Sequence, residues 1–486
     1  MITRNHLIEL QEKAQKLEPN RDQMTHDGKL ILDYVKQFYE GIYESPSWVE
    51  KSDLSAKLLD FPFTNSGYGI ESTLKLFKEE VDESGLNAAC GGHLGYIPGG
   101  GIFHSAMADV LADVTNEYAG HFFASPGAVR VENQFLRWLM EITGFPSNAV
   151  GNLTSGGSIA NLIGITAARD HHEINSTNVR KSVIYTSELL HHCNHKAIRI
   201  SGLNECVQRT IPVDNQGRII SYELERIIQE DQNNDLKPFL IIASAGTTDL
   251  GSIDPLNEIA DICQSQNCWF HVDAAYGGFF VLTEEGKAKL NGIKRADSLV
   301  MDPHKGLFIP YGLGAVLIKN KEALMKSHHY QASYMQDTFD ANDEISPADV
   351  SPELTKHFRG LRAWMPLMIN GVEPFEKAAE EKLALCKYFY KELDSIEGIE
   401  KGPEPELSVC AFRFVSKNMD ADKFNLELCK LIKLDGRVFL SSTTINRQVF
   451  IRFACLSIRT HLETVDTCLK VIKEKILELE KAGLNA

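Results

Sequence analysis

Apolar side chains recur every three or four residues in two stretches near the start of the chain, as they do along one face of a helix. The two stretches are marked by Leu7, Leu10, Ala14 and Leu17, and then by Ile31, Leu32, Val35 and Phe38. We therefore predict that residues 1–90 form a helical arm. An arm with exposed apolar faces usually packs on another surface, and a second subunit is one candidate.

Short apolar runs alternate with helical patterns between residues 150 and 320, which is typical of a mostly parallel sheet with crossover helices. The predicted strands are 182–185, 239–243, 269–272, 298–301 and 315–318. The helix after the second of these strands is predicted to begin with Asp254 as its N-cap and Pro255 at its first position.

Glycine dominates the segment just before this alternating region. Residues 91–101 contain six glycines, which leave the backbone too unconstrained for a regular element. We predict a loop here that approaches another part of the molecule closely. Helices are predicted to follow it at 107–118 and 131–142.

The 486 residues suit two or three structural units. We expect the arm at 1–90, a large α/β domain at 91–370 and a small α+β domain at 371–486. In the last of these, residues 410–414 and 449–453 are predicted to be strands.

Composition removes several classes of function. Lys and Arg number 50 against 66 Asp and Glu, and the net charge of −16 argues against nucleic acid or an anionic membrane as a partner. No run reaches the roughly 18 apolar residues of a membrane span, and the N-terminus lacks the apolar core of a secretory signal. The ten cysteines show neither zinc nor redox spacing, so reduced thiols, no metal site and a cytoplasmic location are expected.

Polar residues gather where the predicted strands end, which is the edge of a parallel sheet at which ligands bind. They are His191, residues 246–248, Asp273 and residues 302–305, together with residues 154–158 at a predicted helix start. Taken singly, these residues have ordinary alternatives. Residues 154–158 could be a plain helix cap, and His191 could be a core or surface histidine. Asp273 could cap a turn, and Lys305 could be a solvated charge. Their joint order is what indicates a site.

One ligand would use all of these groups. Backbone N–H groups at a glycine-flanked helix start suit a phosphate, and a carboxylate can keep a heterocyclic nitrogen protonated. A desolvated lysine can form an imine with an aldehyde, and an imidazole can stack on a flat ring. A phosphate, a pyridine nitrogen and an aldehyde together describe pyridoxal 5'-phosphate, which is the predicted cofactor.

The order of residues 154–158, His191, 271–278 and 302–305 resembles the group II pyridoxal-phosphate-dependent amino acid decarboxylases. That family includes the aromatic-L-amino-acid and glutamate decarboxylases, and the similarity covers about residues 90–370. It implies the aspartate-aminotransferase type of fold, fold type I. This fold has a large domain with a mostly parallel seven-stranded sheet, a small α+β C-terminal domain, and a homodimer with active sites at its interface.

The resemblance also implies roles for the matching residues. Lys305 would hold the cofactor as an imine, Asp273 would pair with the pyridine nitrogen, and His191 would stack on the ring, so these three are the expected catalytic residues. The other expected cofactor-binding residues are Gly157, Ser158 and His304 at the phosphate, Ala275 on the second face of the ring, and Thr248 near Asp273. The implied reaction converts an L-amino acid to its amine and carbon dioxide through a quinonoid intermediate.

Two departures from the family pattern leave alternatives open. The loop 336–357 contains no tyrosine, whereas relatives commonly carry one there as the proton donor; Tyr330 and Tyr334 lie just upstream. Relatives without that tyrosine can form aldehydes with oxygen, so an aldehyde-forming decarboxylase is an alternative. A carbon–carbon lyase on the same cofactor and a catalytically silent dimer are two further alternatives, although the presence of Lys305, Asp273 and His191 together argues against the silent dimer. The second departure is Gly306, where many relatives have a bulky aromatic residue.

The substrate is indicated only by the glycine-rich loop. Its resemblance to the family places Tyr96, Ile97 and Pro98 beside the substrate side chain, where apolar walls suit an aromatic or aliphatic group. The ordinary alternative is that these residues only support the fold.

Overall fold

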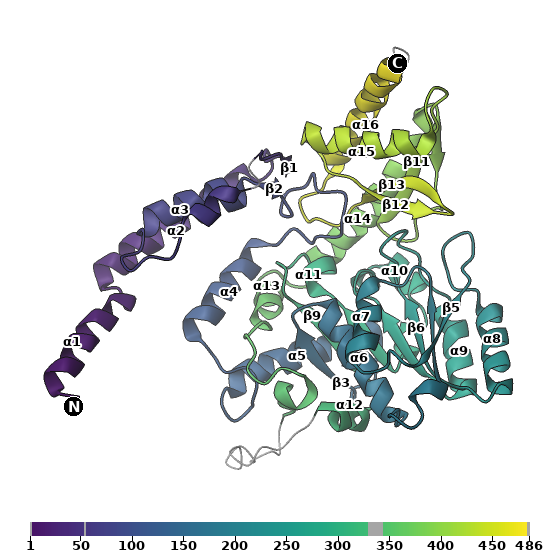
Figure 1. Ribbon diagram of the computed structural model, residues 1–486, viewed down its shortest axis with the longest axis horizontal. Coiled ribbons are helices and arrows are strands. Elements are labelled where there is room, and N and C mark those ends of the chain that lie inside the picture. Colours follow the sequence, from purple (N-terminus) through teal and green to yellow (C-terminus); the bar gives the residue numbers. More distant parts are fainter. Residues whose placement is uncertain (1, 53–54, 329–343, 484–486) are drawn as a thin grey trace.

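A seven-stranded sheet forms the centre of the computed structural model, which describes residues 2–52, 55–328 and 344–483 (Figure 1). Its strand order is β3-β9-β8-β7-β6-β4-β5, and only β9 runs antiparallel to its neighbours. The strands are β3 (Val150–Thr154), β4 (Ser182–Ser187), β5 (Val207–Ile211), β6 (Lys237–Ser244), β7 (Trp269–Asp273), β8 (Ser298–Met301) and β9 (Gly314–Ile318). The predicted α/β class and mostly parallel seven-stranded sheet are therefore confirmed.

Alternate residues of the strands face two helical layers. Ile241 and Ala243 of β6 belong to a core shared with three helices, whereas Leu240 and Ile242 belong to the core on the opposite face. This alternation is the period of two that a strand buried on both faces requires. The first layer contains α5 (Pro126–Thr143), α8 (Ser221–Asn233) and α9 (Leu256–Gln266), and the second contains α6 (Gly157–His171), α7 (His192–Ile200) and α12 (Lys321–His328).

Two strands of this sheet were not predicted. β3 contains Gly151, where a Cβ atom would lie 2.6 Å from the carbonyl oxygen of Val316 on β9, so this position cannot carry an apolar signal. β5 is an edge strand whose Gln208 and Thr210 are exposed. Both strands depend on contacts with neighbours rather than on their own apolar runs.

The predicted start of α9 was wrong by one residue. The helix begins at Leu256, and Pro255 occupies the N-cap. The buried carboxylate of Asp254 instead accepts hydrogen bonds from the backbone N–H groups of Ser244 and Ile219, both at 2.7 Å. Asp254 therefore ties the end of β6 to the segment before α8, and both its oxygens are occupied.

The glycine-rich loop makes the close approach that its composition predicts. A Cβ atom on Gly99 would lie 2.7 Å from the carbonyl oxygen of Lys305. The guanidinium of Arg459 holds the loop by donating to the carbonyl oxygens of Ala89 and Gly101 at 2.9 and 2.7 Å. The loop leads into α4 (Phe103–Thr115), which packs on α13 (Leu361–Asn370).

A second, antiparallel sheet lies in the C-terminal part of the chain, with the order β10-β11-β13-β12. The two strands predicted here correspond to β11 and β13. The strands are β10 (Ile399–Lys401), β11 (Val409–Phe414), β12 (Ser441–Ile445) and β13 (Gln448–Ala454), and the helices around them are α14 (Glu373–Glu392), α15 (Ala421–Asp435) and α16 (Leu462–Gly483).

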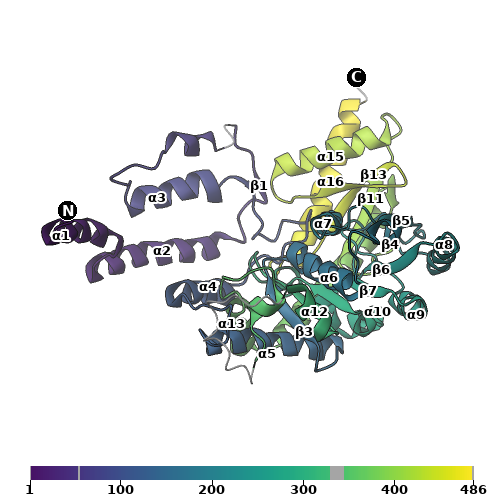
Figure 2. The ribbon, with the colours of Figure 1, turned by 60° about the horizontal axis from the view of Figure 1, so that its bottom comes forward.

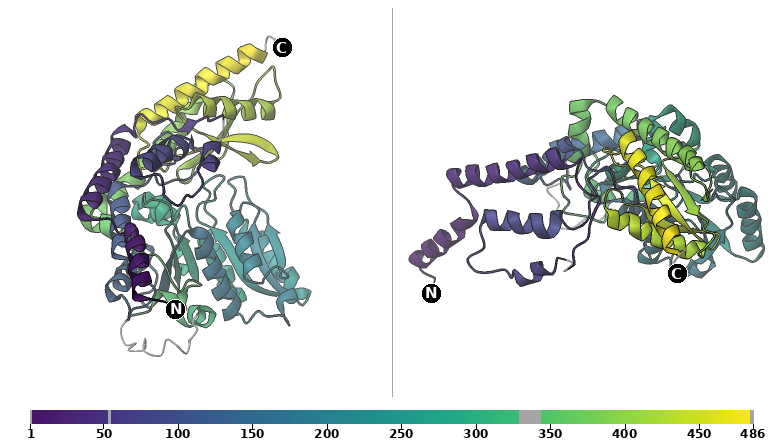
Figure 3. Two further views of the ribbon diagram at one scale, coloured as in Figure 1. Left: turned by 60° about the vertical axis from the view of Figure 1, so that its left-hand side comes forward. Right: turned by 90° about the horizontal axis from the view of Figure 1, so that it is seen from above.

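The N-terminal helices project from the rest of the molecule (Figures 2 and 3). None of the described residues in α1 (Arg4–Ala14), α2 (Arg21–Gly41) or α3 (Ile70–Phe77) is buried. A short pairing of β1 (Trp48–Val49) with β2 (Gly85–Leu86) closes this segment. Among the described residues, no helix has the length and apolar character needed to cross a membrane.

Candidate active site

A cavity of about 460 Å³ lies at the carboxyl ends of the central strands. β8, β7, β6 and β4 are neighbours that run in one direction, and β3 shares it because β9 is antiparallel to both β3 and β8. The volume is within the roughly 300–1,000 Å³ of small-molecule sites. All eight predicted site residues line this cavity: Gly157, Ser158, His191, Thr248, Asp273, Ala275, His304 and Lys305.

Lys305 lies in α11 (Pro303–Gly306), directly after β8, and only a quarter of its side chain is exposed. Burial acts to lower the pKa of its amine, but the negative charges of Asp302 and Asp273 outweigh burial and raise that pKa. The Lys305 Nζ atom is 3.1 Å from Asp302 Oδ2. Sequence reasoning gave Asp302 no role of its own, although its place one helical turn before Lys305 was an available signal.

His304 is fixed by the backbone. Its Nδ1 atom donates to the carbonyl oxygen of Leu313 at 2.6 Å, so the neutral ring carries its proton on Nδ1. Burial lowers the pKa of His304, although Asp302 opposes this effect. The Nε2 atom is 3.7 Å from Asp302 Oδ2, and His304 therefore offers a neutral imidazole edge to the cavity.

The start of α6 forms a tight cradle. Gly156 has φ +154°, and a Cβ atom there would lie 3.3 Å from His304 Cε1. A Cβ atom on Gly157 would lie 2.8 Å from Asp302 Oδ2. The first N–H groups of a helix lack intrahelical acceptors, so Gly157 and Ser158 can offer backbone donors and the positive end of the helix dipole to a phosphate.

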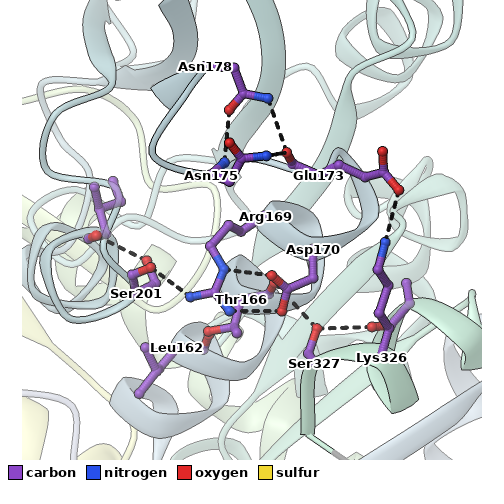
Figure 4. Close-up of polar contacts among 12 residues, drawn as sticks. Leu162, Thr166, Arg169, Asp170, Glu173, Asn175, Asn178, Ser201, Lys326 and Ser327 are labelled. Atoms are coloured by element: carbon purple, nitrogen blue, oxygen red, sulfur yellow. Dashed lines mark hydrogen bonds and ion pairs between the residues drawn. The ribbon is translucent and has the colours of Figure 1, made fainter. Parts of the chain in front are cut away.

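Polar contacts anchor the other end of α6 (Figure 4). Arg169 donates to the carbonyl oxygen of Ser201, which follows α7, at 2.8 Å and forms a bidentate pair with Asp170. Lys326 of α12 pairs with Glu173 at 3.2 Å. The helix that carries the glycine cradle is thus held by α7 and α12.

Asp273 is held by two side-chain amides. Asn194 and Asn161 donate to its Oδ2 atom at 2.7 and 3.1 Å, and the backbone N–H of Ala275 donates to Oδ1 at 3.1 Å. Neither asparagine was predicted. Their signals were spacing alone, since Asn194 is three residues after His191 and Asn161 is four residues after Gly157.

His191 is the N-cap of α7, and its Nδ1 atom accepts from the backbone N–H of Cys193 at 3.3 Å. Burial lowers the pKa of His191, and the charge of Asp273 partly offsets this effect. A neutral ring with Nδ1 as an acceptor carries its proton on Nε2. His191 therefore presents an uncharged imidazole to the cavity.

The residues present fit pyridoxal phosphate. The cavity combines a lysine amine, a carboxylate held by side-chain amides and a helix start with a glycine cradle. Asp302 Oδ1 is also buried without a hydrogen-bond partner among the described residues, which leaves an acceptor for a bound group.

The structure describes one of the two departures from the family pattern, Gly306, and only part of the loop without a tyrosine. A Cβ atom on Gly306 would lie 2.6 Å from Cβ of Phe279, so Phe279 occupies the space that a larger residue after Lys305 would need. Tyr330, Tyr334 and residues 336–343 of the predicted loop lie outside the described residues.

Comparison with known proteins identifies the family. The family model described as the pyridoxal-dependent decarboxylase conserved domain matches residues 93–415. The aromatic-L-amino-acid decarboxylase of Bacillus atrophaeus is 30% identical over 466 residues, which is 95% of this chain and 97% of the relative. The L-2,4-diaminobutyrate decarboxylase of Acinetobacter baumannii is 25% identical, covering 94% and 95% of the two chains.

A solved structure of Oryza sativa TDC with PLP and tryptamine has the same fold, with a TM-score of 0.89 and 23% identity, and the match covers 95% of this chain and 99% of that one. The chain belongs to the pyridoxal-dependent decarboxylase family. It is a pyridoxal-phosphate-dependent amino acid decarboxylase of fold type I, as its sequence predicted.

Proposed function

We propose that this decarboxylase acts on an L-amino acid with an aromatic or otherwise apolar side chain and releases the amine. The observation that carries the assignment of the site is the convergence of Lys305, Asp273 and the start of α6 on one cavity. Bound pyridoxal phosphate supplies an electron-withdrawing ring that accepts the electron pair left when carbon dioxide departs.

The surrounding residues then have distinct tasks. The amine of Lys305 would attach the cofactor, and Asp302 is placed to hold that amine. Asp273 would hold the proton at the pyridine nitrogen, with Thr248 near it, and His191 and Ala275 would cover the two faces of the ring. Gly157, Ser158 and His304 would hold the phosphate.

A smaller hollow of about 170 Å³ supports the choice of substrate. It is lined by the backbone of Gly99 and by Pro98, Ile309 and Pro310, and it shares His304 and Tyr311 with the main cavity. Apolar walls of this kind suit an apolar side chain better than a charged one. The name of the Bacillus relative agrees with this choice, whereas that of the Acinetobacter relative indicates a cationic substrate.

A panel of amino acids tests the proposal. The purified protein with pyridoxal phosphate is given tryptophan, tyrosine, phenylalanine, 2,4-diaminobutyrate and glutamate, and carbon dioxide and amine are measured. We expect turnover of at least one aromatic substrate, and Lys305→Ala should lose both the visible absorbance of the covalently bound cofactor and turnover. An unchanged visible spectrum in Lys305→Ala would remove the lysine from its role.

Aldehyde formation is the second candidate, because the loop 336–357 contains no tyrosine. The same assays separate the two, since an aldehyde-forming enzyme consumes oxygen and releases ammonia and peroxide. Equimolar amine and carbon dioxide without peroxide would support simple decarboxylation.

We also propose that the protein works as a cytoplasmic homodimer with its active sites at the interface. The support is the exposed apolar surface of the arm, together with ten unpaired cysteines, all of them within the described residues. We further propose the division into an arm at 1–90, a large domain at 91–370 and a small domain at 371–486.

A further inference from the structure

A buried hydrogen-bond chain runs along the central sheet to Asp273. Trp269 Nε1 is 2.7 Å from Ser298 Oγ, which is 2.7 Å from His271 Nδ1. His271 Nε2 is 2.7 Å from Asn161 Oδ1, and the Nδ2 atom of Asn161 is 3.1 Å from Asp273 Oδ2. Ser298, His271 and Asn161 are fully buried, and the chain joins β7, β8 and α6.

The direction of every bond in this chain is fixed by its two ends. An indole N–H can only donate, and a carboxylate can only accept. Since Asn161 donates to Asp273, its oxygen must accept, so His271 carries its proton on Nε2. Nδ1 of His271 then accepts from the hydroxyl of Ser298, which in turn accepts from Trp269. Flipping the Asn161 amide would place its oxygen against the carboxylate of Asp273 and lose the bond to that carboxylate.

A glycine in the middle of α6 makes this contact possible. A Cβ atom on Gly164 would lie 2.7 Å from His271 Cε1 and 3.3 Å from Ser298 Oγ. Glycine inside a helix is less favourable than alanine. Gly164 lies where α6 approaches the hydrogen-bond chain, and a larger residue there would displace His271.

We propose that Asn161 and His271 are positioning residues for Asp273: the chain from Trp269 fixes the rotation of the carboxylate that faces the pyridine nitrogen. This inference rests on the role proposed for Asp273. Asn194 donates to the same oxygen at 2.7 Å and the backbone N–H of Ala275 donates to Oδ1 at 3.1 Å, so the chain acts together with these two contacts in setting the orientation of the carboxylate. Outer hydrogen-bond partners of this kind change activity about 10- to 100-fold in metal sites, and a similar effect is expected here.

The test compares His271→Leu, which removes the donor to Asn161, with His271→Gln, whose amide can replace Nε2. For His271→Leu we expect kcat to fall about tenfold or more with KM little changed, and the visible spectrum of the holoenzyme and the dissociation constant of pyridoxal phosphate to shift as they do in Asp273→Asn. His271→Gln should restore most of these properties. Val272→Ala, a buried change on the same strand but outside the chain, is the control for lost stability.

Each other outcome decides a different point. Normal kcat and a normal spectrum in a folded His271→Leu protein, with Asp273→Asn impaired, would overturn this inference alone. An Asp273→Asn protein with wild-type spectrum and turnover would instead overturn the role proposed for Asp273. Equal losses in His271→Gln and His271→Leu, matched by Val272→Ala, would show that the chain only supports the fold. If His271→Leu does not fold, the isosteric Asn161→Asp, which sets a carboxylate against Asp273, replaces it in the test. We then expect the same fall in kcat and the same spectral shift, and a normal kcat and spectrum would overturn the inference.

Discussion

The pKa of the Lys305 amine is set by burial and by two nearby carboxylates, and one substitution can change it. Burial lowers the pKa of this amine, whereas Asp302 and Asp273 raise it. Replacing Asp302 by Asn keeps the shape but removes the nearer carboxylate, so the pKa of Lys305 should fall. Only the unprotonated amine attacks an aldehyde, and below the pKa each unit of decrease raises its fraction about tenfold.

For Asp302→Asn we therefore expect the apoprotein to take up pyridoxal phosphate several-fold faster near pH 7, with the pH–rate curve moved to lower pH. Stopped-flow absorbance measures this uptake. Asp261→Asn, an exposed carboxylate paired with Arg295, is the matched control. An unmoved pH–rate curve would mean that Asp302 does not set the protonation of Lys305.

The eight residues predicted from the sequence to bind the cofactor line one cavity, and they could be predicted because their types match the chemistry of a phosphate, a ring nitrogen and an aldehyde. The residues that hold them could not. Asn161 and Asn194 are ordinary helix positions in the sequence, and only the packing of α6 and α7 against β7 brings both amides to Asp273. The function of such residues depends on tertiary distances that spacing along one chain does not specify.

At the scale of elements, a buried ion pair joins α5 to β3 and to the segment before α13. Lys356 Nζ lies 2.8 Å from Glu132 Oε1 and donates to the carbonyl oxygen of Leu153 at 2.9 Å, and the two charged side chains are 0% and 2% exposed. Glu132 also accepts from the backbone N–H of Leu153 at 3.0 Å. Removing one partner leaves an uncompensated charge inside the protein.

Lys356→Met should therefore lower the free energy of unfolding by about 3–5 kcal/mol, as breaking buried pairs does. Thermal unfolding followed by circular dichroism provides the measurement. Lys377→Met is the control, because Lys377 pairs with Glu376 and Glu380 on the surface of α14 and should matter little. A melting temperature for Lys356→Met as high as that of the control would contradict this account.

Strands and helices could be predicted where burial requires a run or a period of apolar residues in the local sequence. The five strands with continuous apolar runs were found, since both of their faces are covered. β3 was missed because Gly151 lies against β9, and β5 was missed because it is an edge strand. Asp254 was misassigned as a cap because its true partners, Ser244 and Ile219, lie in other elements.

At the scale of the whole molecule, the helices α1, α2 and α3 of the arm contain no buried residue among those that the structure describes. Large apolar side chains of α1 and α2 face solvent, among them Leu10 at 48% and Leu32 at 60% exposure. The end of α2 does contact the body, since Tyr39 lies edge-on to Phe103 with ring centroids 5.3 Å apart. Apolar surface on this scale marks an interaction site, and a second copy of this chain is the occupant we propose.

The double variant Leu10→Glu/Leu32→Glu tests that assignment, because charges placed on a buried interface would cost far more than charges left in water. Light scattering after size exclusion should give the wild type a mass near twice the 54.3 kDa of one chain. The variant should shift towards a single chain and lose turnover if the active sites lie at the interface. Tyr222→Glu on α8, where the side chain is 69% exposed, should leave both properties unchanged. A double variant that remains dimeric would show that the arm does not hold the two copies together.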